Sequence, residues 1–327
     1  MKTRTPLLSF VIPVYNVEKY LAACLNSIYS QKVNHELFEV IAVDDCGTDN
    51  SSKILSTYQK LYENFTLLKH EKNKGLGAAR NTGFKSVTGK YVWFIDSDDM
   101  LADNILQNIF ELIQSDNLEI LMFNINTIDD NGVRKNFYAT FPKTTEIING
   151  ITFLASDVVP HWQKPVTAWS RIQKVSFMQE NNLTYPEGIF FEDEELHLKE
   201  LFICERMKYI TDVCYYYRVN NNSIMRSKVS VKKFIDKVKV FTSCLDILKS
   251  YKNQYPQIIK KMYPTYLSVL EQQKKVYLQM TNNERINIRK QLKNIDLSII
   301  FYFTKNKIKF LFYKNPDLYE KISWLIK

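Results

Sequence analysis

Cysteine is scarce in this chain and forms no paired arrangement. None of the five cysteines belongs to a Cys-x-x-Cys pair, so the sequence indicates neither a zinc site nor a disulfide framework. They are Cys24, Cys46, Cys204, Cys214 and Cys244. A folded chain of 327 residues buries enough surface to be stable without such cross-links. The pattern is typical of a reducing compartment, and we expect a cytoplasmic protein.

Long apolar runs are also missing. No stretch approaches the roughly 18 uncharged apolar residues that a membrane-spanning helix needs. Near the N-terminus, Pro13 interrupts a short apolar run, which is too short for the core of a signal peptide. We therefore expect neither kind of segment. With 45% apolar and 24% charged residues, the composition excludes a disordered chain.

Positive charge is concentrated toward the C-terminus. The chain has a formal net charge of +9, and residues 228–327 hold 21 Lys and Arg against 7 Asp and Glu. Aromatic and aliphatic residues alternate with lysines over residues 299–327, which is typical of a segment at a membrane surface. We expect an anionic membrane as partner, at the inner face of the plasma membrane, and no nucleic acid. The alternative is a solvated helical region that packs on the rest of the chain or on a second copy, as a homodimer.

Apolar segments alternate with segments of helical spacing over the first 125 residues. Such alternation indicates an α/β fold with a doubly wound, mostly parallel sheet flanked by helices. The predicted strands are residues 7–13, 38–43, 66–69, 91–95 and 120–123, and the predicted helices follow at 17–28, 49–62, from about 78, and 103–115. We expect one domain over residues 1–227, with halves at 1–125 and 126–227, and a helical region at 228–327.

Acidic residues follow two of the predicted parallel strands. Asp44 and Asp45 end one strand, and Asp96, Asp98 and Asp99 end another. In open α/β sheets ligands bind outside the carboxyl ends of the strands, so these groups should face one crevice. Asp96 and Asp98 together suit a hard cation, Mn²⁺ or Mg²⁺, that keeps other positions for water or phosphate. The alternative is a set of turn and helix-cap aspartates.

Three further segments have functional and structural interpretations. The run Lys74–Asn81 lacks the third glycine of a dinucleotide-binding loop, because Arg80 stands in its place. The acids from Glu192 to Glu195 begin a predicted helix; one could be a general base, or all could simply be favoured by the helix dipole. Arg218 and Arg226 could clamp a diphosphate, or belong to an aromatic strand with a basic loop.

The ordered set of these motifs resembles the inverting family 2 glycosyltransferases, which have the GT-A fold. The resemblance covers residues 7–228, and no single motif in it is specific. The matching segments are residues 9–16, 43–51, 73–81, 96–99, 192–195, and Tyr217-Arg218 with Ser223. The resemblance implies a nucleotide-sugar half at residues 1–125 and an acceptor half at 126–227. It also implies transfer of a sugar from a nucleoside-diphosphate sugar, which we expect to be a UDP-sugar, to a hydroxyl of a glycan or lipid-linked acceptor. Such a reaction would belong to cell-surface polysaccharide synthesis.

The resemblance also implies a role for each matching residue. Asp98, with Asp96, would hold the metal ion at the diphosphate. Asp193 of the Glu192-Asp193 pair would be the general base. Trp169-Ser170-Arg171 departs from the Trp-Asn-Lys usual in relatives, which puts acceptor contacts at that segment in doubt. The donor-binding residues would be Pro13, Tyr15, Asp44, Asp45, Arg80, Asp96, Arg218, Ser223 and Arg226.

Two other functions are compatible with parts of the sequence. A phosphotransferase could use Asp96 of the Asp-x-Asp motif as a covalent nucleophile. In such enzymes, however, the motif usually follows the first strand, whereas here it follows the fourth. A module of the same fold could bind sugar or membrane without turnover, although the intact carboxylates argue against it.

Overall fold

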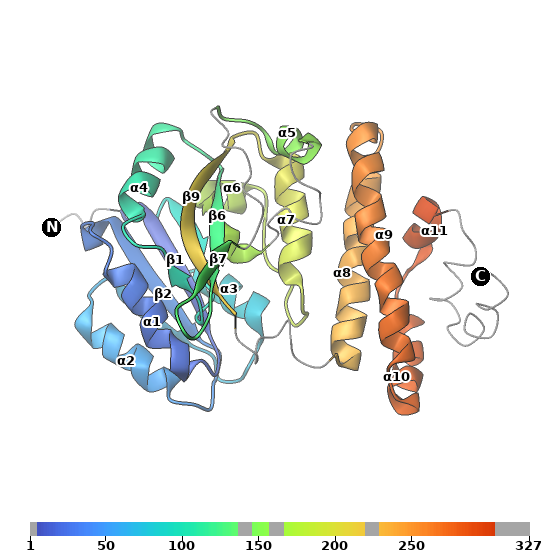
Figure 1. The fold of residues 1–327 in the computed structure, drawn as a ribbon, viewed down its shortest axis with the longest axis horizontal. Coiled ribbons are helices and arrows are strands. Elements are labelled where there is room, and N and C mark those ends of the chain that lie inside the picture. Colours follow the sequence, from blue (N-terminus) through green and yellow to red (C-terminus); the bar gives the residue numbers. More distant parts are fainter. Residues whose placement is uncertain (1–4, 137–145, 157–166, 220–228, 305–327) are drawn as a thin grey trace. The chain divides into compact units, whose positions relative to one another are not determined.

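The computed structural model describes residues 5–136, 146–156, 167–219 and 229–304. Helices and strands alternate along its first half (Figure 1). The first-half elements are β1 Leu8–Val14, α1 Glu18–Tyr29, β2 Phe38–Asp44, α2 Ser51–Leu61, β3 Phe65–Lys69, α3 Leu76–Phe84, β4 Tyr91–Phe94, β5 Met100–Leu101, α4 Leu106–Ser115 and β6 Ile120–Ile128. The later ones are β7 Arg134–Asn136, α5 Gly150–Ala155, β8 Arg171–Lys174, α6 Val175–Glu180, α7 Glu192–Ile203, β9 Met207–Arg218, α8 Val231–Ser250, α9 Pro256–Leu278, α10 Asn282–Leu292 and α11 Ser298–Thr304.

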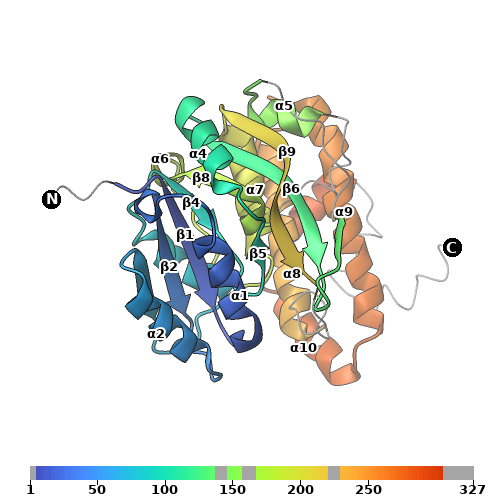
Figure 2. The ribbon, with the colours of Figure 1, turned by 60° about the vertical axis from the view of Figure 1, so that its left-hand side comes forward.

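The sheet confirms the predicted strands and extends beyond them. Its order is β3-β2-β1-β4-β8-β6-β9-β5, with β7 paired to β6. Figure 2 shows the strands from β2 to β5 in this sheet. Strands β3, β2, β1 and β4 are parallel, as predicted. Beyond β4 the sheet is mixed, because β8 runs antiparallel to both β4 and β6, and β5 runs antiparallel to β9. The fold is therefore a parallel half joined to a mixed half.

One predicted strand end needs correction. The sequence suggested that Pro13 ends the first strand, yet β1 continues to Val14, and Pro13 pairs with Val43 of β2. Pairing between β1 and β4 stops at Val11, so Pro13 lies where β1 has no partner on the β4 side. A residue without an N–H donor is tolerated at such an edge.

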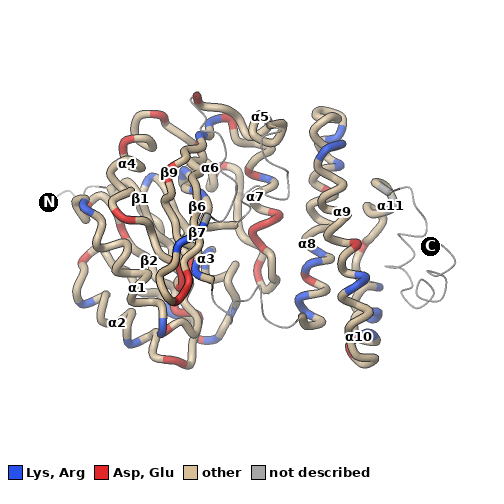
Figure 3. The backbone as a smooth tube through the Cα atoms, viewed as in Figure 1, with Lys and Arg blue, Asp and Glu red and all other residues tan. Residues whose placement is uncertain are grey.

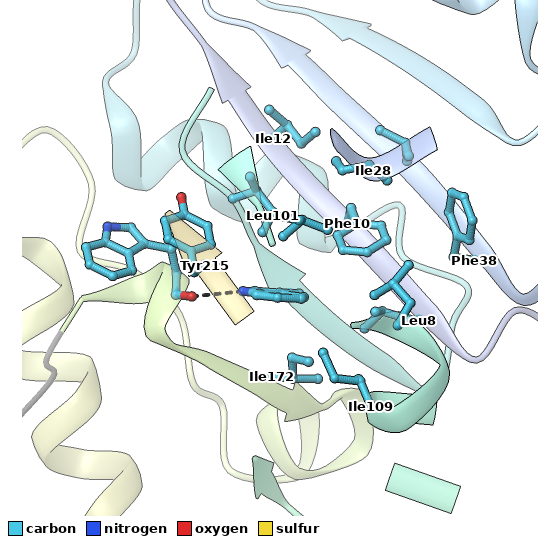
Figure 4. Close-up of a cluster of buried hydrophobic side chains, with 14 of the residues drawn as sticks. Leu8, Phe10, Ile12, Ile28, Phe38, Leu101, Ile109, Ile172 and Tyr215 are labelled. Carbon is cyan, nitrogen blue, oxygen red and sulfur yellow. Dashed lines mark hydrogen bonds between the residues drawn. The ribbon is translucent and has the colours of Figure 1, made fainter. Parts of the chain in front are cut away.

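The core lies against the parallel strands. All seven residues of β1 are buried. Phe10, Leu101 and Tyr215 belong to one apolar cluster (Figure 4), so it joins β1, β5 and β9. Helix α3 approaches β1 closely at Gly83, where an added Cβ would lie 2.4 Å from Cγ1 of Val11. Only glycine allows this approach.

The chain forms two compact units. One comprises Met1–Gly188 and Glu200–Met225, and the other comprises Ile189–Lys199 and Arg226–Lys327. The last change between the units falls at 225/226, beside the predicted boundary at 227/228, and the structure also assigns the start of α7 to the second unit. The described residues of that unit are mostly helical, and Lys and Arg are frequent on α8, α9 and α10 (Figure 3). Within the described ranges, none of the helices combines the length and apolarity needed to cross a membrane.

Candidate functional site

The acidic segments after β2 and β4 lie at one edge of the sheet. Both strands run parallel to β1, so their carboxyl ends point the same way, as predicted. The two strand ends are not adjacent, however, since β1 lies between them. The site is thus built around the carboxyl end of β1, where Tyr15 is 47% exposed. Asn16, the residue after Tyr15, has a φ of 52°. Its side-chain oxygen accepts a hydrogen bond from the Thr48 amide, so the turn after β1 is connected to the loop after β2.

Asp45 is buried and fully engaged in hydrogen bonds. Its Oδ1 lies 2.6 Å from Nδ1 of His70 and accepts the amide of Lys74 at 2.8 Å. Its Oδ2 accepts the amide of Gly75 at 2.9 Å. Since Gly75 is the residue before α3, this carboxylate fixes the start of that helix. Asp44 is also buried, and its Oδ1 accepts the Gly47 amide at 3.4 Å.

Arg80 and Asp96 form a partly buried ion pair. The Arg80 side chain comes from α3, is 2% exposed, and donates from Nη2 to Oδ1 of Asp96 at 2.8 Å. Its guanidinium lies 5.2 Å from the centre of the Tyr185 ring. Charge-assisted hydrogen bonds of this kind are strong and directional. The pair brings together two residues that the sequence assigned to donor binding.

Asp99, which the sequence-based roles omitted, is the most buried of the three aspartates after β4. It accepts hydrogen bonds from the Tyr215 hydroxyl at 2.8 Å and from the Arg218 amide at 2.7 Å. Burial, reinforced by the charges of Asp98 and Asp96, raises the pKa of the Asp99 carboxyl well above its usual range. The Tyr215 hydroxyl also accepts the amide of Asp96 at 3.2 Å. The end of β9 therefore holds the backbone of the Asp96–Asp99 turn.

The Arg218 side chain lies against the same turn. It donates from Nε to the carbonyl of Asp98 at 2.9 Å, and its guanidinium lies 4.9 Å from the centre of the Tyr20 ring. A longer ion pair of 3.7 Å joins it to Asp130. The structure thus places Arg218 at the acidic strand end. Ser223 and Arg226, its predicted companions over a diphosphate, lie outside the described residues.

Asp96 and Asp98 are the two residues at this edge that could hold a metal ion. In the described part of the chain, no group of three or more Asp, Glu, His and Cys residues is arranged to hold a metal ion. Asp96 and Asp98 are both half-buried, and one oxygen of Asp96 already accepts from Arg80. Mg²⁺ is commonly held by one or two carboxylates plus phosphate oxygens and water. Two carboxylates, from Asp96 and Asp98, fit this kind of site better than a site in which the protein supplies every ligand.

Glu192 and Asp193 begin α7 in the second unit. Glu192 is buried and Asp193 is half-buried. The neighbouring Glu194 is also half-buried, and burial together with the Asp193 charge raises the pKa of its carboxyl to about 8. This part of α7 therefore combines several carboxylates at different degrees of burial.

The segment Trp169-Ser170-Arg171 is buried. Trp169 stacks on Tyr215, with ring centres 4.8 Å apart, and Ser170 and Arg171 have no exposed surface. Arg171 forms a 2.8 Å ion pair with Glu200 of α7. These side chains therefore belong to the packed interior of the fold.

Sequence reasoning missed several residues that shape the site. Asp99 was visible in the acidic motif, and Tyr215 in an aromatic run, but nothing indicated that they contact each other. Asn81 exchanges hydrogen bonds with the backbone of Tyr185, and its amide also donates to Glu187 at 3.0 Å. No local sequence signal marks His70 as a partner of Asp45.

Comparison with known proteins identifies a family and several relatives. Residues 9–170 match the family model "Glycosyl transferase family 2". A poly(ribitol-phosphate) beta-glucosyltransferase of Bacillus spizizenii is 30% identical over 66% of this chain, and glycosyltransferase GlyG of Streptococcus pneumoniae is 28% identical over 72% of this chain and 78% of its own length. The chain spans only 32% of the first of these relatives.

Solved structures show the same architecture. TarS of Staphylococcus aureus, residues 1–349 in complex with UDP-GlcNAc, superposes with a TM-score of 0.70 at 23% sequence identity, covering 88% of this chain and 80% of that one. The fold predicted from the motifs is thereby confirmed, with a mixed sheet in its second half. By its sequence match over residues 9–170 and by its fold, the chain contains a glycosyl transferase family 2 domain with the GT-A fold.

Proposed function

We propose that this enzyme transfers a sugar from a UDP-sugar to a hydroxyl of a glycan or lipid-linked acceptor, inverts the anomeric centre, and acts in the synthesis of a cell-surface polysaccharide. The observation that carries the proposal is the Arg80–Asp96 ion pair beside Asp98 at the carboxyl end of the parallel strands. Ligands bind at that edge in open α/β sheets. The UDP-GlcNAc complex of TarS and the names of the poly(ribitol-phosphate) relatives support the donor and the pathway class.

In the proposed reaction the acceptor oxygen attacks the anomeric carbon as its proton passes to Asp193. The bond between that carbon and the β-phosphate oxygen breaks, and UDP leaves with the bonding electrons. A single base and one in-line displacement invert the configuration. Arg80 orients Asp96, and Arg218 stabilises the negative charge that develops on the leaving diphosphate.

Asp98 and Asp96 are the residues that we propose for a Mn²⁺ or Mg²⁺ ion. When bound, the ion would supply charge stabilisation at the diphosphate. Pro13, Tyr15, Asp44 and Asp45 we assign to the base and ribose side of the donor. The carboxylate of Asp45 is also hydrogen-bonded to His70 and two amides, so it holds the loop before α3 as well.

The basic helices suggest a location for the reaction. The second unit has exposed lysines on and between its helices, including Lys232, Lys239, Lys249, Lys252, Lys260 and Lys261. Each basic group near an anionic surface contributes about 1 kcal/mol to binding. We propose that the enzyme docks on the cytoplasmic face of the membrane, where lipid-linked acceptors would be within reach.

Release of UDP from UDP-GlcNAc and UDP-glucose, with water as acceptor, tests the proposed chemistry. We expect turnover with Mn²⁺ or Mg²⁺ that stops with EDTA. Release of phosphate from phosphomonoesters would instead support a phosphotransferase, and donor binding without any turnover would support a non-catalytic module.

A further inference from the structure

The turn before α7 has an unusual backbone conformation. Phe191, the residue directly before Glu192, has a φ of 66°, in the left-handed region that bulky residues rarely adopt. Such conformations are strained and persist only where surrounding contacts enforce them. The carbonyl of Phe191 accepts the amide of Glu194 at 3.3 Å, in the first turn of α7. The conformation of Phe191 therefore sets where α7 begins.

The first two turns of α8 supply the contacts that hold this turn. Asp236 is 4% exposed, and its Oδ2 accepts the backbone amide of Phe190 at 3.2 Å. The Lys232 ammonium forms an ion pair with the same carboxylate and lies 5.0 Å from the centre of the Phe190 ring. The Lys237 ammonium lies 4.9 Å from the centre of the Phe191 ring. Both residues of the turn are thus held by α8.

We propose that Asp236 is a positioning residue for the base Asp193, acting through the Phe190 amide and the strained Phe191. This inference rests on the proposed function, in which Asp193 accepts the acceptor proton. Phe190, whose amide donates the hydrogen bond to Asp236, lies three residues before Asp193 along the chain. A displacement of about 1 Å at a catalytic group can reduce the rate about 10²-fold. The basic C-terminal region then contributes to catalysis as well as to any surface binding.

The test compares Asp236→Ala with Asp236→Asn in the full chain. The Asn side chain keeps an oxygen that can accept the Phe190 amide, whereas Ala removes it. We expect UDP release from UDP-GlcNAc to fall about 10- to 100-fold in kcat for Asp236→Ala and to stay within about threefold of wild type for Asp236→Asn. Binding of UDP with Mn²⁺, measured by calorimetry, should be unchanged in both. Asp246→Ala, an exposed aspartate on the same helix, is the matched control.

A double-mutant cycle with Asp193→Asn identifies the route of the effect. If Asp236 acts through Asp193, the double variant Asp193→Asn/Asp236→Ala should be no slower than Asp193→Asn alone. Additive losses, or parallel losses of UDP binding and turnover, would mean a general structural role and overturn the inference. If Asp193→Asn were fully active, the proposed base itself would fail, and this inference with it. If Asp193→Asn were inactive while Asp236→Ala kept its kcat, only this inference would fail.

Phe191→Gly provides a second test should Asp236→Ala not fold. Glycine adopts a positive φ without strain, so this variant should fold. The substitution also removes the ring that the Lys237 ammonium contacts. Residue 191 then has neither that contact nor a restricted backbone to fix the turn. We expect kcat to fall about tenfold or more with unchanged UDP binding, and an unchanged kcat would overturn the proposal.

Discussion

The hydroxyl of Tyr215 donates a 2.8 Å hydrogen bond to Asp99, although 116 residues separate them in the sequence. The same oxygen accepts the amide of Asp96. One side chain of β9 therefore holds both ends of the turn that bears Asp98. We infer that the acidic motif depends on β9 for its shape.

Replacing Tyr215 with Phe should weaken both the fold and donor binding. Asp99 is buried, and loss of a donor to a buried acceptor costs about 1–3 kcal/mol. We expect a drop of that size in the free energy of unfolding, measured with urea, and weaker binding of UDP with Mn²⁺. Tyr302→Phe, at a partly exposed tyrosine of α11, should have little effect. Equal effects of the two changes would contradict the assigned role.

Replacing Asp98 with Ala should abolish metal-dependent donor binding. Loss of a group that stabilises leaving-group charge typically costs about 10²–10³-fold in kcat. Thermal shift with UDP and Mn²⁺, alongside UDP release, measures both effects. Asp103→Ala, at an aspartate whose side chain is 76% exposed, is the control. Near-normal turnover of Asp98→Ala in the presence of chelator would show that the metal assignment is wrong.

Replacing Asp193 with Asn should preserve UDP binding and remove transfer. The amide keeps the shape of the side chain but cannot accept the proton, and loss of a general base costs roughly 10²–10⁴-fold. Turnover and calorimetric UDP binding are measured side by side, with Glu195→Gln on the same helix as control. Parallel loss of binding and turnover would mean that Glu192 and Asp193 only begin a helix, and normal turnover would move the base to Glu192 or elsewhere.

The parallel half of the fold could be predicted because its signals are local. The strands are apolar runs that are buried along their length, and the helices between them have regular apolar spacing. The acidic strand ends followed from the same pattern. What the sequence could not reveal are contacts between distant segments. Nothing local shows that Met100 pairs with Tyr216, or that Asp45 bonds to His70.

The start of α7 illustrates a second limit. The acids from Glu192 onward predict a helix start, which is confirmed, but a helical pattern does not say which element the helix contacts. The structure groups Ile189–Lys199 with the C-terminal helices, a relation that only tertiary contacts such as Asp236 to Phe190 define. Charge and periodicity, from which the boundary at 227/228 was predicted, carry no signal for this grouping.

Exposed lysines of the second unit should govern membrane binding. Replacing Lys252, Lys260 and Lys261 together with Gln removes three exposed charges from the region of α8 and α9. At about 1 kcal/mol each, binding to anionic vesicles should weaken by roughly two orders of magnitude at low salt. Co-sedimentation with phosphatidylserine-containing vesicles measures this.

The matched control for the lysine variant removes three exposed charges from the first unit, at Lys32, Lys60 and Lys85. Full-length wild-type protein should pellet at low salt and be released at high salt. If it stayed in the supernatant at low salt, or if both triple variants behaved alike, the basic region would be a solvated helical surface.

Glu194 should make stability depend on pH. Its pKa is about 8 in the folded chain, above the ordinary value of 4.5, so the folded state binds the proton more tightly. The free energy of unfolding should then fall as pH rises from about 5 to 8. The residue keeps some contact with solvent, which reduces the size of the effect. Urea unfolding at several pH values should show a flatter profile for Glu194→Gln; an identical profile would exclude Glu194 as the cause.

The pairing of β5 with β9 also bears on how the chain matures during synthesis. Asp99 leaves the ribosome 116 residues before Tyr215. At translation rates of about 5–20 residues per second, the carboxylate waits on the order of ten seconds for its partner. Until then the turn lacks the contacts that Tyr215 makes with Asp99 and Asp96. A nascent chain therefore lacks the hydrogen bond between Tyr215 and Asp99 until β9 emerges, however early the preceding parallel strands have formed.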